Sequence, residues 1–236
     1  MDLKDKVVYI TGGSKGIGYG VAITLLEAGA RVAVSGRTLS TVKEAAKELG
    51  SENNVLGLVS DVSKLGDEKA AVQKILDKWG QLDVVLANAG VGYFAPIDEL
   101  EDDAWHKMID TNLNGVFHTL KASVEALKKS KGYYITLASL AGTNFFASGA
   151  GYNATKFGVV GFTQAVMLDL RKYDIKVSTI MPGSVATHFA GNEPDEKDAW
   201  KIQPEDIGEL VLDLLKMNPR TLPSKIEVRP TRPDKK

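Results

Sequence analysis

The chain has 236 residues, 44% hydrophobic and 25% charged, and a net charge of −1, which argues against disorder and against a nucleic-acid partner bound by phosphate neutralisation. It contains no cysteine, which excludes disulfides, thiolate metal sites and a cysteine nucleophile. No apolar run approaches the roughly 20 residues of a membrane span and no signal peptide opens the sequence, so we expect a cytoplasmic protein without a membrane partner.

Short runs rich in Val, Ile and Leu alternate with longer amphipathic segments along the chain. The runs predict strands at residues 6–11, 31–35, 55–60, 82–87, 133–138, 176–181 and 225–228. The segments between them predict helices at 17–28, 39–49, 64–79, 103–130, 151–173 and 204–217. This alternation predicts one α/β domain over residues 1–236, a Rossmann-type doubly wound parallel sheet of about seven strands with helices on both faces.

Two stretches depart from this alternation. Residues 187–203 form a polar connection longer than most, which we interpret as a substrate loop. Residues 229–236 contain two prolines and several basic side chains, and they predict a flexible tail, with a basic recognition arm as the alternative.

A glycine-rich turn, TGGSKGIG at residues 11–18, follows the first predicted strand and leads into a helix. Gly12, Gly16 and Gly18 allow a sharp turn, a close approach of the backbone to a pyrophosphate, and packing of the helix on the strand. The helix N-terminus offers free N–H groups and a partial positive charge to phosphates. The turn is not a P-loop, because the Gly-Lys-Ser/Thr sequence is missing. A tight turn without a ligand is the alternative reading.

The end of the second predicted strand bears on the kind of dinucleotide. An NAD site usually has an acidic residue there for the ribose hydroxyls, whereas this chain reads Ser35-Gly36-Arg37. Arg37 can hold a 2′-phosphate and Lys15 can approach the same group, although both cations are also consistent with ordinary surface positions. The sequence therefore favours NADP(H) over NAD(H).

Polar residues also follow the third and fourth predicted strands. They are Asp61 and the segment Asn88-Ala89-Gly90. Ligands of open α/β sheets bind at the carboxyl ends of the strands, so both positions lie at the expected edge. A turn cap at Asp61 and a simple strand exit at 88–90 are the alternatives.

A candidate catalytic group lies farther along the chain. Tyr152 and Lys156 have the i, i+4 spacing that places both on one helix face, but about one such Tyr-x-x-x-Lys/Arg pair is expected by accident in this composition. Ser139 ends the fifth predicted strand, thirteen residues before Tyr152, and a short loop can bring it back beside the tyrosine. Asn112 lies inside a predicted helix, where asparagine is a poor helix former. Each residue alone has a common structural explanation.

Taken together, these features resemble the short-chain dehydrogenase/reductase family. The resemblance rests on TGGSKGIG (11–18), DV (61–62), NAG (88–90), Asn112, Ser139, Tyr152-x-x-x-Lys156 and Pro182-Gly183. It implies that Asn112, Ser139, Tyr152 and Lys156 form a catalytic tetrad, and that Thr187 helps to hold the nicotinamide amide. It further implies a homodimer or homotetramer formed through the helices near 103–130 and 151–173.

The cofactor site that we expect combines the glycine turn, the strand ends and the catalytic helix. Its residues are Gly12, Ser14, Lys15, Gly16, Ile17, Gly18, Arg37, Asp61, Val62, Asn88, Ala89, Gly90, Tyr152, Lys156, Pro182, Gly183, Val185 and Thr187. We expect no metal site, because the three histidines have no metal-ligand spacing.

These residue types suit hydride transfer between a carbonyl group and an alcohol with NADP(H). Tyr152 is suited to exchange the proton as general acid or base, and a cationic Lys156 nearby is expected to lower the tyrosine pKa from its ordinary value near 10. Ser139 would hydrogen-bond the substrate oxygen, and Asn112 would anchor a water, a role that the resemblance implies. The alternatives are a non-catalytic dinucleotide-binding sensor or scaffold, an NAD-dependent alcohol dehydrogenase of the same family, and an epimerase or dehydratase.

The substrate itself is not identified by the sequence. Candidates are 3-oxoacyl thioesters, small ketones or aldehydes, sugars and steroids, and the short loop at 187–203 favours a modest pocket. Aromatic residues near the expected site are consistent either with an apolar pocket or with closure of the core. They are Tyr93, Phe94, Phe145, Phe146, Phe189 and Trp200.

Overall fold

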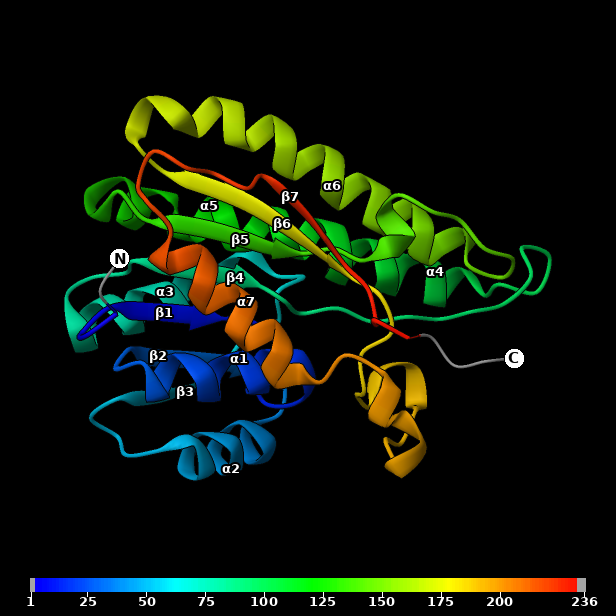
Figure 1. The fold of residues 1–236 in the computed structure, drawn as a ribbon, viewed down its shortest axis with the longest axis horizontal. Coiled ribbons are helices and arrows are strands. Elements are labelled where there is room, and N and C mark those ends of the chain that lie inside the picture. The colour runs from blue at the N-terminus through cyan, green and yellow to red at the C-terminus, as the bar shows by residue number, and fades with distance from the viewer. Residues whose placement is uncertain (1–2, 233–236) are drawn as a thin grey trace.

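Seven parallel strands form one sheet in the computed structural model, which describes residues 3–232. The strands are β1 (Val7–Ile10), β2 (Arg31–Gly36), β3 (Val55–Val59), β4 (Val84–Ala87), β5 (Tyr133–Leu137), β6 (Lys176–Pro182) and β7 (Lys225–Val228). Their order across the sheet is β3-β2-β1-β4-β5-β6-β7, and every neighbouring pair is parallel (Figure 1). The expected doubly wound α/β architecture is confirmed.

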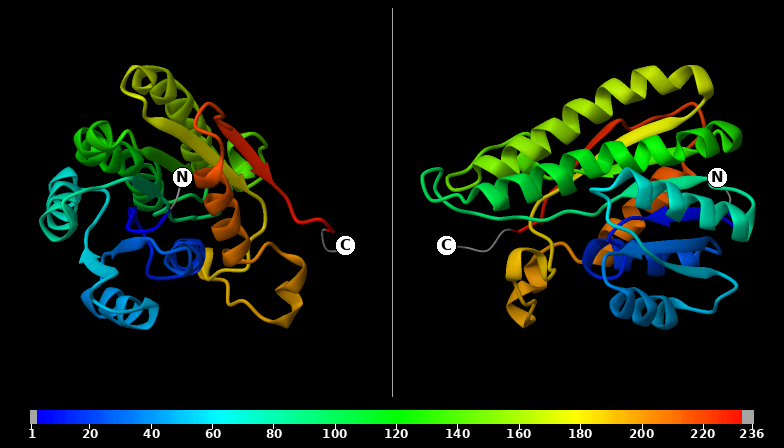
Figure 2. Two further views of the ribbon diagram at one scale, coloured as in Figure 1. Left: turned by 60° about the vertical axis from the view of Figure 1, so that its left-hand side comes forward. Right: turned by 180° about the vertical axis from the view of Figure 1, so that it is seen from behind.

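Helices cover both faces of the sheet. They are α1 (Gly16–Glu27), α2 (Leu39–Leu49), α3 (Leu65–Trp79), α4 (Asp102–Met108), α5 (Gly115–Ser130), α6 (Ala150–Leu170) and α7 (Pro204–Lys216). From behind, α3, α5 and α6 lie in front of the sheet, whereas α7 lies on the opposite face (Figure 2).

Each strand contributes to two hydrophobic cores because successive side chains point to opposite faces. In β1, Val7 and Tyr9 pack on the side of α3, α5 and α6, whereas Val8 and Ile10 pack on the side of α1 and α7. Burial on both faces explains why the strands are continuous apolar runs in the sequence.

The predicted helix at 103–130 is wrong in one respect, because it is not a single α-helix. A π-helical turn, Ile109–Asn114, separates α4 from α5, and the N–H of Gly115 donates to the carbonyl of Asp110, five residues earlier. Such turns insert one extra residue into a helix and are frequent at functional sites. Elsewhere the predicted element ends differ from the observed ones by no more than two residues, except that α6 ends at Leu170, three residues before the predicted end, and continues as a 3₁₀ turn, Arg171–Tyr173.

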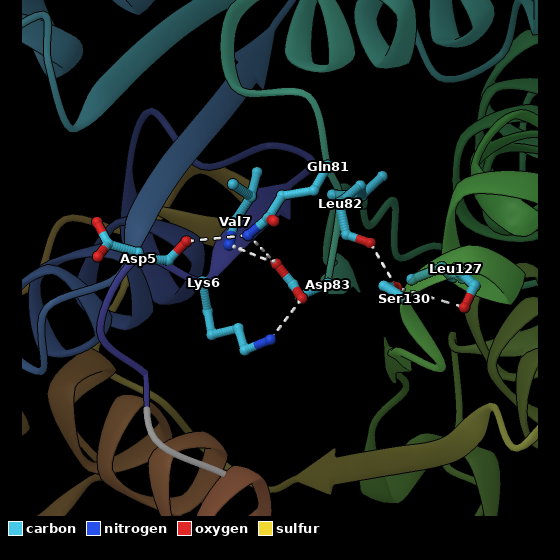
Figure 3. A network of polar contacts seen from close by, with 8 residues as sticks. All are labelled: Asp5, Lys6, Val7, Gln81, Leu82, Asp83, Leu127 and Ser130. Carbon is cyan, nitrogen blue, oxygen red and sulfur yellow. Dashed lines mark hydrogen bonds and ion pairs between the residues drawn. The ribbon is translucent and has the colours of Figure 1, made fainter.

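A buried carboxylate joins the amino-terminal ends of β1 and β4 (Figure 3). Asp83 is 3% exposed and accepts hydrogen bonds from Lys6 Nζ at 2.9 Å, from the Val7 N–H at 2.9 Å and from Gln81 Nε2 at 3.0 Å. The Ser130 hydroxyl, at the end of α5, donates to the Leu82 carbonyl at 2.7 Å. This edge of the sheet lies opposite the edge that carries the candidate site.

The segment 187–203 leaves the sheet after β6 and returns to α7 as a loop closed at its base. Val185 pairs with Ile202 in an isolated parallel bridge, and the Ala186 N–H donates to the Ile202 carbonyl at 2.9 Å. Two short 3₁₀ turns, Phe189–Gly191 and Glu196–Trp200, lie between these points, and in Figure 1 this part projects below the sheet.

The predicted tail is described only in part, and the helices were compared with the length of a membrane span. Of the tail predicted at 229–236, residues 229–232 form no helix or strand, and residues 233–236 lie outside the described part. Between residues 3 and 232, every helix is too short or too polar to cross a membrane.

Candidate active site

The glycine turn between β1 and α1 has the geometry that its glycines require. Gly12 and Gly16 adopt φ values of +63° and +58°, in the left-handed region. A Cβ atom at Gly12 would lie 2.9 Å from the Cα of Ala89, and one at Gly18 would lie 2.6 Å from the Asn88 side-chain nitrogen. Larger residues would therefore push the turn away from the segment after β4.

The N-terminus of α1 is free to bind an anion. Lys15 is the N-cap residue and makes no side-chain cap, and no acidic residue occupies the first turn. The helix therefore presents N–H groups and the positive end of its dipole beside the glycine turn. The cradle that the glycines leave open and the uncapped helix end fit the pyrophosphate of a dinucleotide.

Hydrogen bonds between Thr11, Gly12 and the segment after β4 hold the glycine turn in place. Asn88 Nδ2 donates to the carbonyls of Thr11, at 2.8 Å, and Gly12, at 3.1 Å. The Thr11 hydroxyl oxygen accepts from the N–H groups of Asn88 and Ala89, each at 3.1 Å. Thr11 was not among the predicted site residues, although it is the first residue of the motif.

Two exposed cations lie near the glycine turn: Arg37, which follows β2, and Lys15, the N-cap residue of α1. Ser14 Oγ would lie 3.2 Å from a Cβ placed on Gly36, so the glycine turn and the strand end are adjacent. Lys15 and Arg37 are exposed, and neither forms an ion pair with any residue between 3 and 232. Ile17, on the first turn of α1, packs against the core instead.

Asp61 forms the turn cap that was the alternative interpretation. Its Oδ1 accepts from the Ser63 N–H at 3.1 Å and from the Ser63 hydroxyl at 2.7 Å. The neighbouring Val62 is buried, and its carbonyl lies 2.9 Å from Nδ1 of His118. Both residues follow the end of β3, at the carboxyl edge of the sheet, where the sequence predicted them.

A buried polar network, not predicted from the sequence, links the strands below these positions. The Tyr9 hydroxyl donates to Glu68 Oε1 at 2.9 Å and accepts from Ser35 Oγ at 3.0 Å, and Ser60 Oγ donates to the same carboxylate oxygen at 2.6 Å. Burial, and then the Glu68 charge, raise the pKa of Tyr9 well above its usual range. The network fixes the ends of β2 and β3.

Tyr152 and Lys156 lie on the first two turns of α6. Lys156 is 5% exposed, its Nζ donates to the Leu137 carbonyl at 2.8 Å, and the same nitrogen lies 5.6 Å from the centre of the Tyr152 ring. The helix thus places the amine behind the phenol, against the end of β5.

Ser139 meets Tyr152 from the other side. It follows β5 and caps the 3₁₀ turn Leu140–Gly142, where its Oγ accepts from the Ala141 N–H at 3.1 Å. Its side chain also lies close enough to the Tyr152 hydroxyl to oppose the rise in the pKa of that phenol. The loop between β5 and α6 therefore returns the serine to the tyrosine, as the spacing suggested.

Asn112 occupies the π-helical turn and is almost completely buried. Its Oδ1 accepts from the Val91 N–H and its Nδ2 donates to the Val91 carbonyl, both at 2.8 Å, while Nδ2 also donates to Thr155 Oγ1 at 3.1 Å. A Cβ atom on Gly90 would lie 3.4 Å from Asn112 Oδ1 and 3.8 Å from Lys156 Nζ. The four candidate catalytic residues are therefore brought to one place.

The protein environment shifts both titratable groups toward their neutral forms. Burial raises the pKa of Tyr152 to about 12, and the hydrogen bond with Ser139 opposes this rise. Burial lowers the pKa of Lys156 to about 8. The direction for Tyr152 is opposite to the one expected from the charge of Lys156, because removal from water is the largest cause of the shift.

The last predicted positions follow β6. Pro182 ends the strand, the Gly183 N–H donates to the Val228 carbonyl at 2.8 Å, and Val185 forms the base of the loop. A Cβ atom on Gly16 would lie 3.4 Å from Thr187 Cγ2, so Thr187 faces the glycine turn.

Aromatic rings surround the Tyr152 phenol. The ring centres of Phe94 and Phe189 lie 5.4 Å and 5.6 Å from that of Tyr152, and Phe146 lies 5.8 Å from Phe94. No group of three or more possible metal ligands occurs in the described part of the chain.

Known proteins resemble this chain in sequence. The sequence matches the family described as short chain dehydrogenase over residues 6–198. It is 32% identical over 233 residues to an uncharacterized oxidoreductase of Staphylococcus saprophyticus, covering 98% of this chain and 99% of that protein.

Two solved structures are similar over nearly their whole length. An alcohol dehydrogenase of the archaeon Thermococcus sibiricus, complexed with 5-hydroxy-NADP, has a TM-score of 0.91 and 32% identity, with 98% of this chain and 100% of that chain covered. A 3-ketoacyl-(acyl-carrier-protein) reductase of Brucella melitensis, complexed with NADH, has a TM-score of 0.90 and 26% identity, with coverage of 98% and 99%. Since the family match extends from β1 into the loop after β6, the chain belongs to the short-chain dehydrogenase family of oxidoreductases.

Proposed function

We propose that this protein interconverts a carbonyl compound and an alcohol by hydride transfer, with Tyr152 as the general acid and base. The observation that carries the proposal is the position of Tyr152, with Lys156 Nζ 5.6 Å from its ring centre and Ser139 beside its hydroxyl, at the sheet edge that also carries the glycine turn. Two hydroxyl groups that converge on one point are suited to hold a carbonyl oxygen as it gains negative charge.

Tyr152 supplies the proton in the reducing direction. With a pKa near 12, the phenol is protonated at neutral pH and is ready to donate to the developing alkoxide. In the oxidising direction the tyrosinate takes the alcohol proton, and Ser139 hydrogen-bonds the same oxygen.

Lys156 stabilises the charge that forms on Tyr152. With a pKa of about 8, its amine is mostly protonated at pH 7, and a cation near the phenol favours the tyrosinate once the proton has left. Asn112 holds the segment after β4 in place through its paired bonds to Val91, which keeps Gly90 open beside the amine.

The cofactor of the proposed reaction is a nicotinamide dinucleotide, which supplies or accepts the hydride when bound. The glycine turn and the N-terminus of α1 would hold its pyrophosphate, Asp61 and Val62 would border the adenosine, and Thr187 would contact the nicotinamide amide. We infer a preference for NADP(H), because the residue after β2 is Arg37 instead of an acid, and because neither Arg37 nor Lys15 at the N-terminus of α1 forms an ion pair within residues 3–232. Related structures contain an NADP derivative in one case and NADH in another.

We also propose that the protein forms homo-oligomers through α5 and α6. Apolar side chains remain exposed on these two helices, with Phe117 at 46%, Phe157 at 43% and Leu168 at 58%. Exposed apolar residues on adjacent helices are typical of a face that is covered by a second subunit.

Replacement of Tyr152 by Phe tests the reaction. We expect the rate of NADPH-dependent reduction across a panel of simple ketones and aldehydes to fall about 10²–10⁴-fold, while NADPH binding measured by fluorescence changes little, because only the transferable proton is lost. Tyr173→Phe, in the 3₁₀ turn that follows α6, is the matched control and should keep the wild-type rate. Full activity in the Tyr152→Phe variant would contradict the mechanism, and cofactor binding without any turnover in the wild type would favour a sensor.

The cofactor preference is tested with Arg37→Ala. Loss of a charge-assisted hydrogen bond to a phosphate should raise the dissociation constant of NADPH about tenfold or more and leave that of NADH nearly unchanged. Arg220→Ala, an exposed arginine outside the site, is the control. Equal effects on the two cofactors would overturn the assignment of Arg37.

A further inference from the structure

A carboxylate that the proposed reaction does not use lies completely buried beside the ends of three strands. It belongs to Glu68, in the first turn of α3. Among residues 3–232, no cation forms an ion pair with it and no donor reaches its second oxygen, Oε2. A buried carboxylate without a counterion destabilises a fold, so a position that keeps one is a candidate for a function.

Hydroxyl groups from β1, β2 and β3, which are neighbours in the sheet (Figure 1), converge on this carboxylate. Tyr9, on β1, and Ser60, which follows β3, both donate to Glu68 Oε1. Ser35, on β2, donates in turn to the Tyr9 hydroxyl. The three hydroxyl residues are at most 2% exposed. We call these four residues the Glu68 network (Tyr9, Ser35, Ser60 and Glu68).

The strand ends that the network holds continue into segments of the proposed cofactor site. Arg37 lies two residues after Ser35, and Asp61 directly follows Ser60. The Ser35 carbonyl also accepts from the Gly13 N–H, in the glycine turn, at 3.1 Å. The network therefore joins the glycine turn and the ends of β2 and β3, which are the parts of the site expected to bind the phosphorylated adenosine half of a dinucleotide.

Two further bonds connect the same strand ends to each other and to α3. The Ser60 N–H donates to the Gly36 carbonyl at 3.0 Å, and the Asp61 N–H donates to Asp67 Oδ2 at 3.2 Å. Two consecutive side chains of α3 thus hold the end of β3, one through its backbone and one through the Ser60 hydroxyl. Because these bonds are shared, a change at Glu68 would shift the ends of β2 and β3 relative to each other.

We propose that Glu68 is a positioning residue for the cofactor, which sets the ends of β2 and β3 at the separation at which Arg37 and Asp61 bind phosphorylated adenosine. This inference rests on the proposed function, since it concerns the cofactor site of the same reaction. Glu68 is enclosed by the protein, so it acts only through the residues that it holds. These are Ser60 directly and Ser35 by way of Tyr9.

The competing explanation is that the network only stabilises the fold. Asp83 provides the comparison, because it is a second buried carboxylate, with three hydrogen bonds, at the opposite edge of the sheet. If both carboxylates serve stability alone, replacing either one affects cofactor binding only through the fraction of unfolded protein. Under the proposal, only changes in the Glu68 network weaken binding by the folded protein.

The first experiment measures binding of adenosine 2′,5′-bisphosphate, which carries the phosphorylated adenosine half without a nicotinamide. Glu68→Gln supplies a weaker acceptor of similar shape, and calorimetry on the full chain should show a dissociation constant raised about three- to tenfold. The dissociation constant of NADPH should rise by the same factor. Asp83→Asn, the same exchange at the other edge, is the matched control and should leave both constants within twofold of the wild type. Urea unfolding verifies that each variant is folded during the measurement.

Tyr9→Phe tests the same network without removing a charge. It deletes the hydroxyl that connects Glu68 to Ser35, so it should raise the dissociation constant of the probe about three- to tenfold as well. Added to Glu68→Gln, it should have little further effect, because both changes break one chain of bonds. Tyr133→Phe is its matched control. That buried hydroxyl is bonded to Ser178 Oγ at 2.7 Å on the opposite face of the sheet, and its loss should leave probe binding unchanged.

Steady-state kinetics separates positioning from catalysis. In Glu68→Gln and Tyr9→Phe, the KM for NADPH should rise, whereas kcat at saturating NADPH and the KM for the carbonyl compound should stay within twofold of the wild type. Loss of kcat without a change in probe binding would overturn the inference.

The probe also separates this inference from the proposed function, because its binding does not depend on turnover. Unchanged probe binding in both network variants, or equal weakening by the two controls, would overturn the inference and leave the proposed function standing. Weaker probe binding in the variants of a protein that reduces no carbonyl compound would overturn the proposed function and leave the inference standing. A wild type that binds neither the probe nor NADPH would overturn both.

Discussion

Lys156 illustrates at the scale of one residue what the candidate site costs the fold. Its amine is enclosed beside Tyr152, has the Leu137 carbonyl as its only hydrogen-bond acceptor among the described residues, and has a pKa lowered by burial from 10.5 to about 8. A charged group that loses water without gaining a counterion destabilises the folded state. The same burial makes the amine responsive to a charge that forms on the neighbouring phenol.

Replacement of Lys156 by Met should therefore stabilise the protein near neutral pH. The pKa is 10.5 in the unfolded chain and about 8 in the folded one, so the buried charge destabilises the folded state by roughly 3 kcal/mol. The variant also loses the hydrogen bond to Leu137, which reduces the gain in stability by about 1 kcal/mol. We expect the variant to gain about 2 kcal/mol at pH 7 in urea unfolding of the cofactor-free protein.

The pH dependence of this gain has a defined sign. Below pH 8 the amine is charged in both states, so the destabilisation is complete and constant. Between pH 8 and 10.5 the unfolded chain binds the proton that the folded protein has lost, so the wild type gains stability with rising pH and the advantage of Lys156→Met shrinks. Lys121→Met, at an exposed position on α5, should show no such trend, and a gain that persists unchanged at pH 10.5 would contradict the explanation.

At the scale of secondary-structure elements, the two edges of the sheet have different tasks. The carboxyl edge carries the glycine turn, Ser139 and the loop to Thr187, whereas the amino edge holds β1 and β4 together through Asp83. Because the Asp83 carboxylate is buried and receives three hydrogen bonds, its loss would leave the Val7 N–H and the Lys6 amine without their acceptor.

We therefore expect Asp83→Ala to lower the free energy of unfolding by about 2–4 kcal/mol without changing the chemistry at the opposite edge. Glu125→Ala removes an exposed ion pair with Lys128 and should cost less than about 0.5 kcal/mol. Equilibrium unfolding in urea gives both numbers, and cofactor binding by the folded fraction reports on the site. Similar losses of unfolding free energy in the two variants would contradict the prediction, because the buried contacts of Asp83 would then stabilise the fold no more than the exposed Glu125–Lys128 ion pair.

Most elements were predictable because their apolar patterns are local. Val7 to Ile10 are buried on both faces, and such a run has few alternatives to a central parallel strand. The π-helical turn was not predictable, because the bonds that hold Asn112 go to Val91, twenty-one residues earlier in the chain.

The candidate site likewise has a part that the sequence predicts and a part that depends on the fold. Motif spacing located Tyr152 and Lys156 because four residues make one helical turn. The direction of the Tyr152 pKa shift depends on burial by Phe94, Phe189 and the strand end, which the spacing does not contain. Phe94 and Phe189, which both contact the Tyr152 ring, are ninety-five positions apart in the sequence, so only the fold reveals that they are neighbours of the same residue.

At the scale of the whole molecule, α5 and α6 offer the surface on which a second subunit would bind, on the rear face of the sheet (Figure 2). We expect the wild type to elute as a dimer or larger assembly in size-exclusion chromatography with light scattering. Leu168→Glu places a charge on this surface and should produce monomers at low micromolar concentration. Leu39→Glu, at a 55% exposed position on α2, is the matched control. A monomeric wild type, or equal behaviour of the two variants, would contradict the proposed interface.

The bridge between Val185 and Ile202 has a consequence for how such a protein diversifies. It closes the loop 187–203 at its base, so the loop is anchored independently of its own length and composition. Insertions or exchanges between these two anchor points would alter the ring that Phe189 places against Tyr152, while the sheet and α6, which carries Tyr152, keep their positions. Mutations in this loop can thus change which substrate is bound without moving the residues on the sheet and on α6.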